Sequence, residues 1–369
     1  MKGAKMAHIV IDARRINSST GHYMLRLVQH LEKIDSTNRY TVVVLEKEKD
    51  YYAPRAKNFA VHTTRADHYT LAEQTTLALL LYRLKPDLVH FTMPQQPLVW
   101  FGKRVTTIHD TTLIRYENID GNKYVYKIQK AIFYALMRNV IRRSRYILSP
   151  SEYVSKDLDT WTGGRYTNKL LPIKIAGDPV EGTPKPVAEL VGKQYLFWVG
   201  NAFPYKNVDK IVDAFALVKK THRNLHLALA GKRDIFYQKI EEQVKQKKIA
   251  EVHILGYISD EEKIWLFKNA QAYVVASLSE GFHMPLHEAM HAGCPVISSN
   301  ATCLPEVAGD AVLYFDPNNI TQLADAIDIV LKNKKLVSSL KQKGYRQVKK
   351  FSWESTAKQT LDLYNKAIS

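Results

Sequence analysis

The chain has 369 residues, a length that favours two domains over one at roughly 150 residues per domain. Apolar residues make up 46% of the sequence and charged residues 24%, so the composition excludes a disordered or fibrous chain. The formal net charge of +17 indicates an anionic partner or a strongly solvated basic surface.

The cysteine content and the apolar runs indicate the compartment. The only cysteines, Cys294 and Cys303, are too few for a disulfide framework or a C-x-x-C metal site. The start, MKGAKMAHIVIDARR, lacks the apolar core of ~7–15 residues that a secretory signal needs. No apolar run approaches the ~20 residues that span a bilayer. We therefore expect a cytoplasmic protein.

Short apolar runs alternate with helical patterns along the first half of the chain. Strands are expected at residues 7–13, 40–46, 88–92, 104–110 and 145–150, and helices near 21–33, 70–84 and 123–143. Near-continuous apolar strands separated by helices indicate a parallel sheet that is covered on both faces.

Residues 123 to 145, KYVYKIQKAIFYALMRNVIRRSR, form a basic amphipathic helix with seven basic residues and no acidic one. One face carries Lys123, Lys127, Lys130, Arg138, Arg142 and Arg145, and the other carries Val125, Ile128, Ile132, Ala135 and Leu136. The basic face is either the solvated side of a helix packed on the core, or a surface for anionic lipid or a phosphate-bearing substrate. Nucleic acid is not expected, because no nucleic-acid-binding motif accompanies the charge.

The second half repeats the alternation after a segment with three prolines and three glycines, residues 176–193. We place the domain boundary there, between residues 1–178 and residues 179–351. Strands are expected at 195–200, 225–231, 252–257, 272–277, 295–300 and 311–315, and helices near 207–220, 235–248, 259–269, 284–292 and 320–333. Two such sheets predict an α/β protein with two Rossmann-like domains.

The stretch EGFHMPLHE, residues 280 to 288, joins a predicted strand to a helix with Pro285 near its start and Gly293 just past its end. Ligands of open α/β sheets bind outside the carboxyl ends of the strands. The unpaired N–H groups and the dipole of a helix start favour an anion. Glu280 and Glu288 flank this start and can accept hydrogen bonds from sugar hydroxyls, so the pattern suits a nucleotide sugar.

The run from Glu280 to Pro317 resembles the E-x7-E region of the retaining glycosyltransferases of family 4, the group 1 transferases with the GT-B fold. Further matches in the family's order are IDARRINSSTGHY, VTTIHDTTLIRY, ILSPSEYVSKDL, WVGNAFPYKN, LALAGK, VHILGYISDEE and KFSWESTAKQTLDLY. The resemblance covers nearly the whole chain. It implies two parallel sheets that face each other across a cleft, and a last helix, about 352–369, that packs back on the N-terminal domain.

The resemblance assigns the donor site to the C-terminal domain. Glu280 would contact hydroxyls of the transferred sugar, Glu288 would hold the ribose, and Lys206 would neutralise the diphosphate. Fixed positive charge lowers the barrier because negative charge grows on the leaving group. The other donor contacts implied are Asn201, Gly256, Tyr257, Gly281, Phe282, His283 and Met284.

In the N-terminal domain the resemblance implies one loop contact and one strand end. Gly21 matches the loop that approaches the donor phosphates. His109 and Asp110 match the strand end under the transferred sugar. With Lys206 and Glu280 they make up the expected catalytic group.

Three features depart from the family pattern. The N-terminal loop STGHY has one glycine where two are common. His283 stands where a glycine is common, so a residue with a side chain makes a close backbone approach. An arginine that commonly accompanies the lysine is absent, with Asn201 and Tyr205 at the positions available. The substitutes that the sequence offers are Arg14, Arg15 and Lys232.

No metal or other cofactor is expected. His283 and His287 lie four apart, but no H-E-x-x-H pattern or third ligand accompanies them. Asp157 and Asp159 form a D-x-D on a predicted surface helix, where we expect both carboxylates to be solvated.

The sequence thus predicts a hexosyltransferase that uses GDP- or UDP-activated mannose or glucose. The acceptor would be a glycan or a lipid-linked glycan in the synthesis of cell-surface polysaccharide, with peripheral contact to the membrane. Two alternatives stay open: a nucleotide-sugar epimerase of the same fold, and a non-catalytic membrane-binding or nucleic-acid-binding protein that kept the fold.

Overall fold

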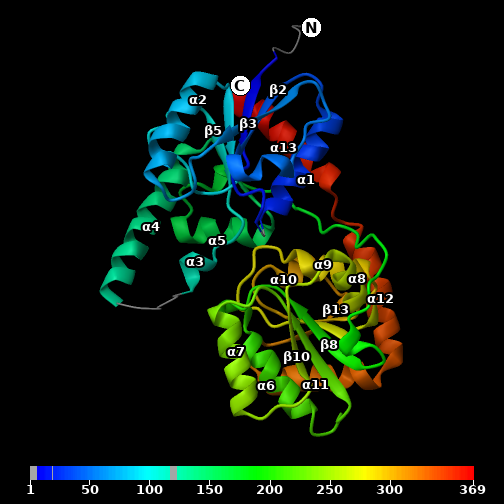
Figure 1. The fold of residues 1–369 in the computed structure, drawn as a ribbon. Coiled ribbons are helices and arrows are strands. Elements are labelled where there is room, and N and C mark those ends of the chain that lie inside the picture. Colours follow the sequence, from blue (N-terminus) through cyan, green and yellow to red (C-terminus); the bar gives the residue numbers. More distant parts are fainter. Residues whose placement is uncertain (1–5, 19, 117–122) are drawn as a thin grey trace. The chain divides into compact units, whose positions relative to one another are not determined.

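The computed structural model describes residues 6–18, 20–116 and 123–369, and the side chains of residues 123–125 lie outside the description. The chain forms two compact units (Figure 1). One unit comprises Met1–Ile175 with Ser352–Ser369, and the other comprises Ala176–Phe351. The chain therefore crosses from the second unit back to the first at Ser352.

The first unit is built on a parallel sheet of seven strands in the order β3-β2-β1-β4-β5-β6-β7. The five strands predicted from the sequence are confirmed, and the strands β3 and β7 were missed. Both missed strands are edge strands, which are less apolar because they have only one neighbour. The strands are β1 (His8–Asp12), β2 (Arg39–Leu45), β3 (Phe59–Thr64), β4 (Leu88–Phe91), β5 (Arg104–Thr107), β6 (Tyr146–Ser149) and β7 (Leu170–Pro172).

Helices cover this sheet, and the last of them is the end of the chain. They are α1 (Gly21–Ile34), α2 (Ala78–Leu84), α3 (Thr112–Arg115), α4 (Lys123–Arg143), α5 (Glu152–Thr162) and α13 (Trp353–Ile368), with shorter helical segments η1 (Glu46–Tyr51), η2 (Glu73–Leu77) and η3 (Thr167–Lys169). Helix α13 packs on α1. Its buried Tyr364 hydroxyl lies 2.6 Å from Nδ1 of His90 on β4.

The structure corrects the predicted packing of α4. The residues that α4 buries in the core are Met137, Val140 and Ile141. The predicted apolar face does not pack there, since Ile128 and Ile132 are 62% and 53% exposed. Both faces of the helix carry apolar residues, so periodicity alone could not say which one meets the sheet.

The second unit is built on a parallel sheet of six strands in the order β10-β9-β8-β11-β12-β13. All six strands predicted from the sequence are confirmed. The four inner strands are buried on both faces and give nearly continuous apolar runs. The six strands are β8 (Gln194–Val199), β9 (Leu225–Ala230), β10 (Val252–Gly256), β11 (Ala272–Val275), β12 (Val296–Ser299) and β13 (Val312–Phe315).

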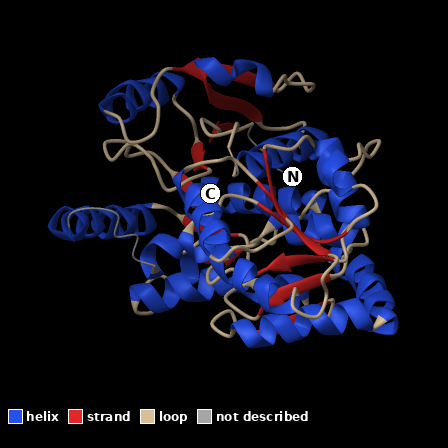
Figure 2. Ribbon diagram, turned by 60° about the horizontal axis from the view of Figure 1, so that its bottom comes forward, coloured by secondary structure: helices blue, strands red, loops and turns tan. Residues whose placement is uncertain are grey.

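Helices cover both faces of this sheet. Figure 2 shows the helices in blue and the strands in red. Alternate residues of β8 point to opposite faces. Leu196 and Trp198 belong to the core that α6, α7 and α11 share, whereas Phe197 meets Phe267 of α8 edge to face. The helices are α6 (Val208–Val218), α7 (Ile235–Gln246), α8 (Asp260–Asn269), α9 (Met284–His291), α10 (Leu304–Ala308), α11 (Ile320–Lys332) and α12 (Lys334–Val348), with the segments η4 (Ala188–Leu190) and η5 (Pro204–Lys206).

The strand order of the second unit reverses between β8 and β11. From β8 the chain moves outward to β9 and β10, and it then returns to the other side of β8 with β11. The loops that leave β8 and β11 therefore diverge at the carboxyl edge of the sheet, which is where open α/β sheets bind ligands.

Candidate active site

The loops that follow β8 and β11 are fixed to each other. The N–H of Leu278 donates to the carbonyl of Tyr205 at 2.7 Å. The side-chain amide of Asn207 donates to the carbonyls of Ala276 and Pro317 at 3.1 and 2.9 Å. These bonds hold the two loops that carry Lys206 and Glu280 in one arrangement.

Glu280 is the centre of a buried polar cluster at this edge. Its side chain is 8% exposed, and the ammonium of Lys206 donates to Oε1 at 2.7 Å and to Oε2 at 2.9 Å. Oε1 also accepts from Ser277 Oγ at 2.7 Å and from His283 Nδ1 at 2.8 Å. A carboxylate has about four acceptor positions, so Oε1 is saturated and Oε2 keeps room for one more donor.

The surroundings keep Glu280 ionised. Burial alone would raise the pKa of this carboxyl, but the Lys206 ammonium and the His283 ring hold it well below its ordinary value. His283 must donate from Nδ1, because the carboxylate can only accept. Its Nε2, 3.1 Å from the hydroxyl of buried Tyr273, is then the acceptor when the ring is neutral.

His283 adopts the backbone conformation that explains why a glycine is common at this position. Its φ of 70° and ψ of 70° lie in the left-handed region, where histidine is uncommon but less strained than most residues. Glycine would lack the bonds to Glu280 and Tyr273. Histidine in place of glycine therefore fits this backbone conformation less easily but adds two side-chain contacts.

Glu288 lies on α9 and is tethered from α8. The ammonium of Lys263 lies 3.1 Å from Oε2 of Glu288 and 3.2 Å from Oδ1 of Asp260. Burial alone would lower the pKa of Lys263, but the charges of Glu288 and Asp260 raise it. Sequence reasoning missed Lys263 because no motif marks it.

The ends of β8, β9 and β10 contribute small or exposed residues. The Oδ1 of Asn201 is buried and has no hydrogen-bond partner among the described residues, which is unusual for a buried acceptor. A Cβ on Gly231 would lie 1.9 Å from the carbonyl oxygen of Gly200. Gly256 has a φ of 72°, and the Tyr257 ring beside it is 89% exposed.

The turn into α9 presents backbone more than side chains. The ring of Phe282 is buried and meets the ring of His287 edge to face at 4.9 Å. Gly281 is buried, and Met284 is half-buried as the first residue of α9. Any contact that Phe282 makes with a ligand would therefore involve its backbone.

His109 and Asp110 follow β5 in the first unit. The ring of His109 meets Tyr23 edge to face at 4.9 Å, and its Nε2 donates to the carbonyl of Thr92 at 2.9 Å. Burial lowers the pKa of His109, although the bond to Thr92 opposes the shift. The exposed Asp110 accepts from the N–H of Thr112 at 2.8 Å. His109 is thus neutral at pH 7, with Nδ1 as its acceptor.

Comparison with known proteins identifies the family. Residues 183–347 match the family model described as Glycosyl transferases group 1. The O-antigen chain mannosyltransferase B of Escherichia coli is 28% identical over 275 residues, which are 71% of this chain and 70% of that protein. The second unit carries a group 1 glycosyl transferase domain.

Other comparisons of this group 1 transferase agree with that assignment. The O-antigen chain mannosyltransferase RfbU of Salmonella typhimurium is 28% identical over 250 residues, which are 62% of this chain and 69% of that protein. Among solved structures, a sucrose-phosphate synthase from Thermosynechococcus elongatus covers 98% of both chains with a TM-score of 0.76 and 16% identity. HepE of Anabaena in complex with UDP-glucose covers 98% of this chain and 100% of its own, with a TM-score of 0.75 and 13% identity. The solved structures establish the GT-B fold. The family match and the mannosyltransferase relatives favour an enzyme over the non-catalytic alternative.

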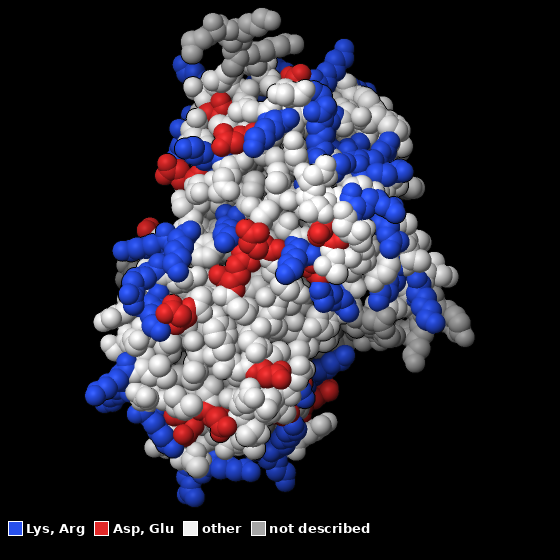
Figure 3. Space-filling model, turned by 180° about the vertical axis from the view of Figure 1, so that it is seen from behind, with Lys and Arg blue, Asp and Glu red and all other residues white. Residues whose placement is uncertain are grey.

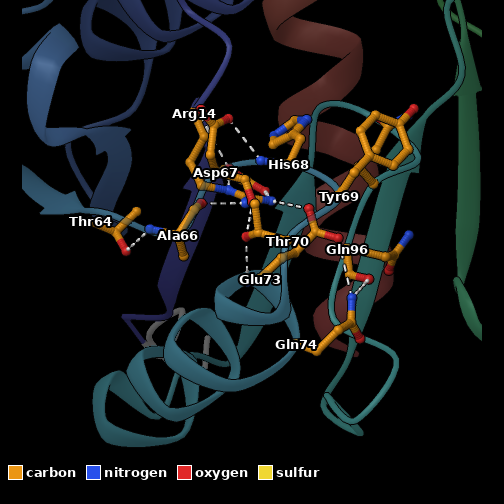
Figure 4. A network of polar contacts seen from close by, with 12 residues as sticks. Arg14, Thr64, Ala66, Asp67, His68, Tyr69, Thr70, Glu73, Gln74 and Gln96 are labelled. Atoms are coloured by element: carbon orange, nitrogen blue, oxygen red, sulfur yellow. Dashed lines mark hydrogen bonds and ion pairs between the residues drawn. The ribbon is translucent and has the colours of Figure 1, made fainter.

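The group 1 transferase does not use Arg14 to replace the arginine that is absent near Lys206. Arg14 is fully buried in the first unit, and its guanidinium donates to both carboxylate oxygens of Asp12 at 2.9 Å. It also donates to the carbonyl of Ala66 at 2.7 Å and lies 3.3 Å from Glu73 (Figure 4). Four of its five N–H donors are engaged in this buried network, so this suggestion from the sequence is wrong. Arg15 and Lys232 are exposed, and their suggested role stays a prediction.

The D-x-D of the transferase is structural at its first position, which corrects the expectation of a solvated pair. Asp157 is buried and accepts from Nε of Arg115 at 2.7 Å. Asp159 accepts from the hydroxyl of Thr167 at 2.6 Å. Asp157 lies on the buried side of α5, which the D-x-D pattern alone could not show.

Within the described residues of the transferase, no group of three or more His, Cys, Asp or Glu residues is placed to hold a metal ion. His287 is fully buried, and burial lowers its pKa to about 4. His287 is therefore neutral at pH 7 and packs among aromatic rings.

Gly21 of the transferase begins α1, where its backbone is in close contact with the preceding turn. A Cβ at this position would lie 1.8 Å from the carbonyl oxygen of Ile16. We expect Gly21→Ala to displace the start of α1 and to lower the free energy of unfolding by about 1–3 kcal/mol. Urea denaturation measures the change. An unchanged midpoint would show that the turn yields to a methyl group at no cost.

Proposed function

We propose that this group 1 transferase moves a hexose of the mannose or glucose type from a nucleotide sugar to a glycan or lipid-linked acceptor, with retention at the anomeric carbon. The acceptor would belong to the synthesis of cell-surface polysaccharide. The O-antigen mannosyltransferases among its relatives support this setting.

The observation that carries the proposal is the Lys206–Glu280 pair at the point where the strand order reverses. The pair joins a cation suited to a diphosphate and a carboxylate suited to a sugar hydroxyl within 2.9 Å. Because Oε1 is saturated, we propose that a hydroxyl of the transferred sugar donates to Oε2. Glu288 would take the ribose hydroxyls, and the unpartnered Oδ1 of Asn201 would take a further donor of the nucleotide.

The proposed reaction breaks the bond between the anomeric carbon and the phosphate oxygen, whose electron pair leaves with the diphosphate. The acceptor oxygen bonds to the same face of the anomeric carbon, and its proton passes to the departing phosphate oxygen. Lys206 and the N–H groups that begin α9 would stabilise the charge that grows on the diphosphate. Neutral His109 and exposed Asp110 would contact the transferred sugar from the first unit. Glu280 stays an acceptor throughout because its pKa is low.

The names of the relatives indicate which class of sugar nucleotide could serve as the donor. HepE binds UDP-glucose, and the O-antigen enzymes are mannosyltransferases. We propose UDP- or GDP-hexose as the donor class. In the described part of the chain no helix has the length and apolar character needed to cross a bilayer.

We expect a thermal-shift screen against UDP, GDP, ADP and their common sugars to identify the donor. A ligand that binds only the folded state adds about 2.7 kcal/mol of stability at a hundredfold excess over its Kd. The shift should fall in Glu288→Ala and persist in Glu242→Ala, an exposed glutamate on α7 that serves as a matched control.

Two outcomes would contradict this proposal. If no nucleotide shifts the melting temperature, the proposed donor site is wrong. If Glu288→Ala shows the same shift as the native protein, Glu288 does not contact the nucleotide. Transfer is then tested with the donor that binds. A reaction that changes the donor sugar without an acceptor would indicate an epimerase.

A further inference from the structure

The first unit has a pocket whose lining contains none of the predicted site residues. It lies between the C-terminal half of α4 and the end of α5, and has a volume of about 630 Å³. Its lining includes Arg138, Asn139 and Arg142 of α4, and Trp161, Arg165 and Tyr166 at the end of α5. No acidic residue lines it.

The three arginines of this pocket have no carboxylate partner among the described residues. Arg138 lies over the ring of Trp161, 5.0 Å from its centre, which holds the guanidinium at the pocket wall. No described ion pair involves Arg142 or Arg165. The nearby acids of α5 are engaged elsewhere, since Asp157 pairs with Arg115 and Asp159 accepts from Thr167.

Uncompensated arginines around one hollow favour an anionic ligand. Like charges repel one another, and an anion between them removes the repulsion. The planar guanidinium presents paired N–H donors that match the oxygens of a phosphate group. The amide of Asn139 and the hydroxyl of Tyr166 are neutral donors at the same wall.

We propose that the pocket between α4 and α5 binds a phosphate group, through Arg138, Arg142 and Arg165. The phosphate can belong to a soluble molecule or to the head group of an anionic lipid. The exposed Ile128 and Ile132 also lie on α4, nearer its N-terminus than the arginines of the pocket. Figure 1 shows the N-terminal part of α4 extending from the rest of the first unit. Lys and Arg side chains are also widespread on the face of the first unit seen in Figure 3.

The test uses the full chain and two probes of the same chemistry. Inorganic pyrophosphate is titrated by calorimetry, and vesicles of phosphatidylcholine with phosphatidic acid are compared with vesicles of phosphatidylcholine alone. We expect binding to at least one phosphate probe, weakened by salt. Replacing the three arginines by glutamine should weaken it at least about tenfold.

The matched control changes three exposed arginines elsewhere, Arg83, Arg223 and Arg346, to glutamine, which alters the net charge equally. It should keep the binding. Arg165→Gln alone, in the turn after α5, tests the site if the triple variant unfolds, and should weaken binding at least about threefold.

The outcomes separate the two sources of phosphate. Binding to pyrophosphate with no preference for anionic vesicles identifies a soluble ligand, and the reverse identifies a lipid. Failure of both probes, or equal loss in the matched control, would overturn the site. Donor binding measured by thermal shift is independent of either result.

Discussion

Lys206→Met is expected to lower kcat by about 100-fold, because it removes the cation that we propose faces the departing diphosphate. The same change leaves the Glu280 carboxylate, 8% exposed, without its counter-ion. Loss of one partner of a buried ion pair costs about 3–5 kcal/mol of stability. Steady-state kinetics and urea denaturation measure the two effects separately.

The stability effect has a pH dependence that identifies its cause. In the native protein the pKa of Glu280 is lowered from its ordinary value of 4.5, so its ionised form stabilises the fold above that value and the contribution is lost as the pH falls through the lowered pKa. In Lys206→Met burial should dominate and raise the pKa of Glu280. The carboxylate then destabilises the fold at neutral pH, and protonation relieves the penalty. The stability deficit should therefore narrow as the pH falls from about 7 to about 4.

Lys206→Arg is the control, since it keeps the charge. It should retain most of the stability and lose some activity, because the guanidinium differs in shape from the ammonium. A Lys206→Met protein that is destabilised yet turns over at the native rate would remove Lys206 from the reaction. A deficit that is independent of pH would remove the ion pair as the cause.

Arg14→Met should destabilise the first unit by about 3–5 kcal/mol, because it leaves two buried carboxyl groups without their cation. Burial disfavours ionisation of Asp12, but Arg14 holds the pKa of Asp12 below its ordinary value. Burial together with the charge of Asp12 raises the pKa of Glu73, despite the opposing charge of Arg14. The variant would also lose the bond to the carbonyl of Ala66. Urea denaturation, followed by circular dichroism, measures the loss.

Arg15→Met is the matched control for this prediction. Arg15 is the next residue along the chain and is exposed, so the same substitution should change stability by less than about 0.5 kcal/mol. Similar losses in the two variants would show that the buried network around Arg14 contributes little. Nucleotide binding should survive in Arg14→Met below its melting temperature, since Asn201, Lys206 and Glu288, which we propose hold the nucleotide, lie in the other unit.

The sequence predicted the sheets well where burial is complete on both faces. The inner strands of both sheets, apart from the more polar β5, carry apolar runs, and the half-buried edge strands β10 and β13 carry shorter ones. Strand β3 is buried only at its two ends, and β7 has three residues, so neither gives such a run. The helix α4 was predicted correctly, but its buried face was not. The core contains Met137 and Ile141, whereas the sequence pattern favoured the face with Ile128 and Ile132.

The candidate site was predictable as a set of residues but not as a set of contacts. Lys206 and Glu280 were named from their motifs, and 74 residues separate them. Their contact depends on the pairing of β8 with β11, which no local pattern encodes. Ser277 could have been noticed as a hydroxyl three residues before Glu280 at a strand end. Lys263 could not, because it faces Glu288 only once α8 and α9 are packed.

The return of the chain to the first unit at α13 has a consequence for synthesis in the cell. Translation proceeds from the N-terminus, so the second unit is complete before α13 leaves the ribosome. Until then His90 of β4 lacks Tyr364, and the surface of α1 that α13 covers stays open. The unit that is synthesised first is thus the one that finishes folding last, and a chain that stops short of α13 would combine a complete second unit with an unfinished first unit.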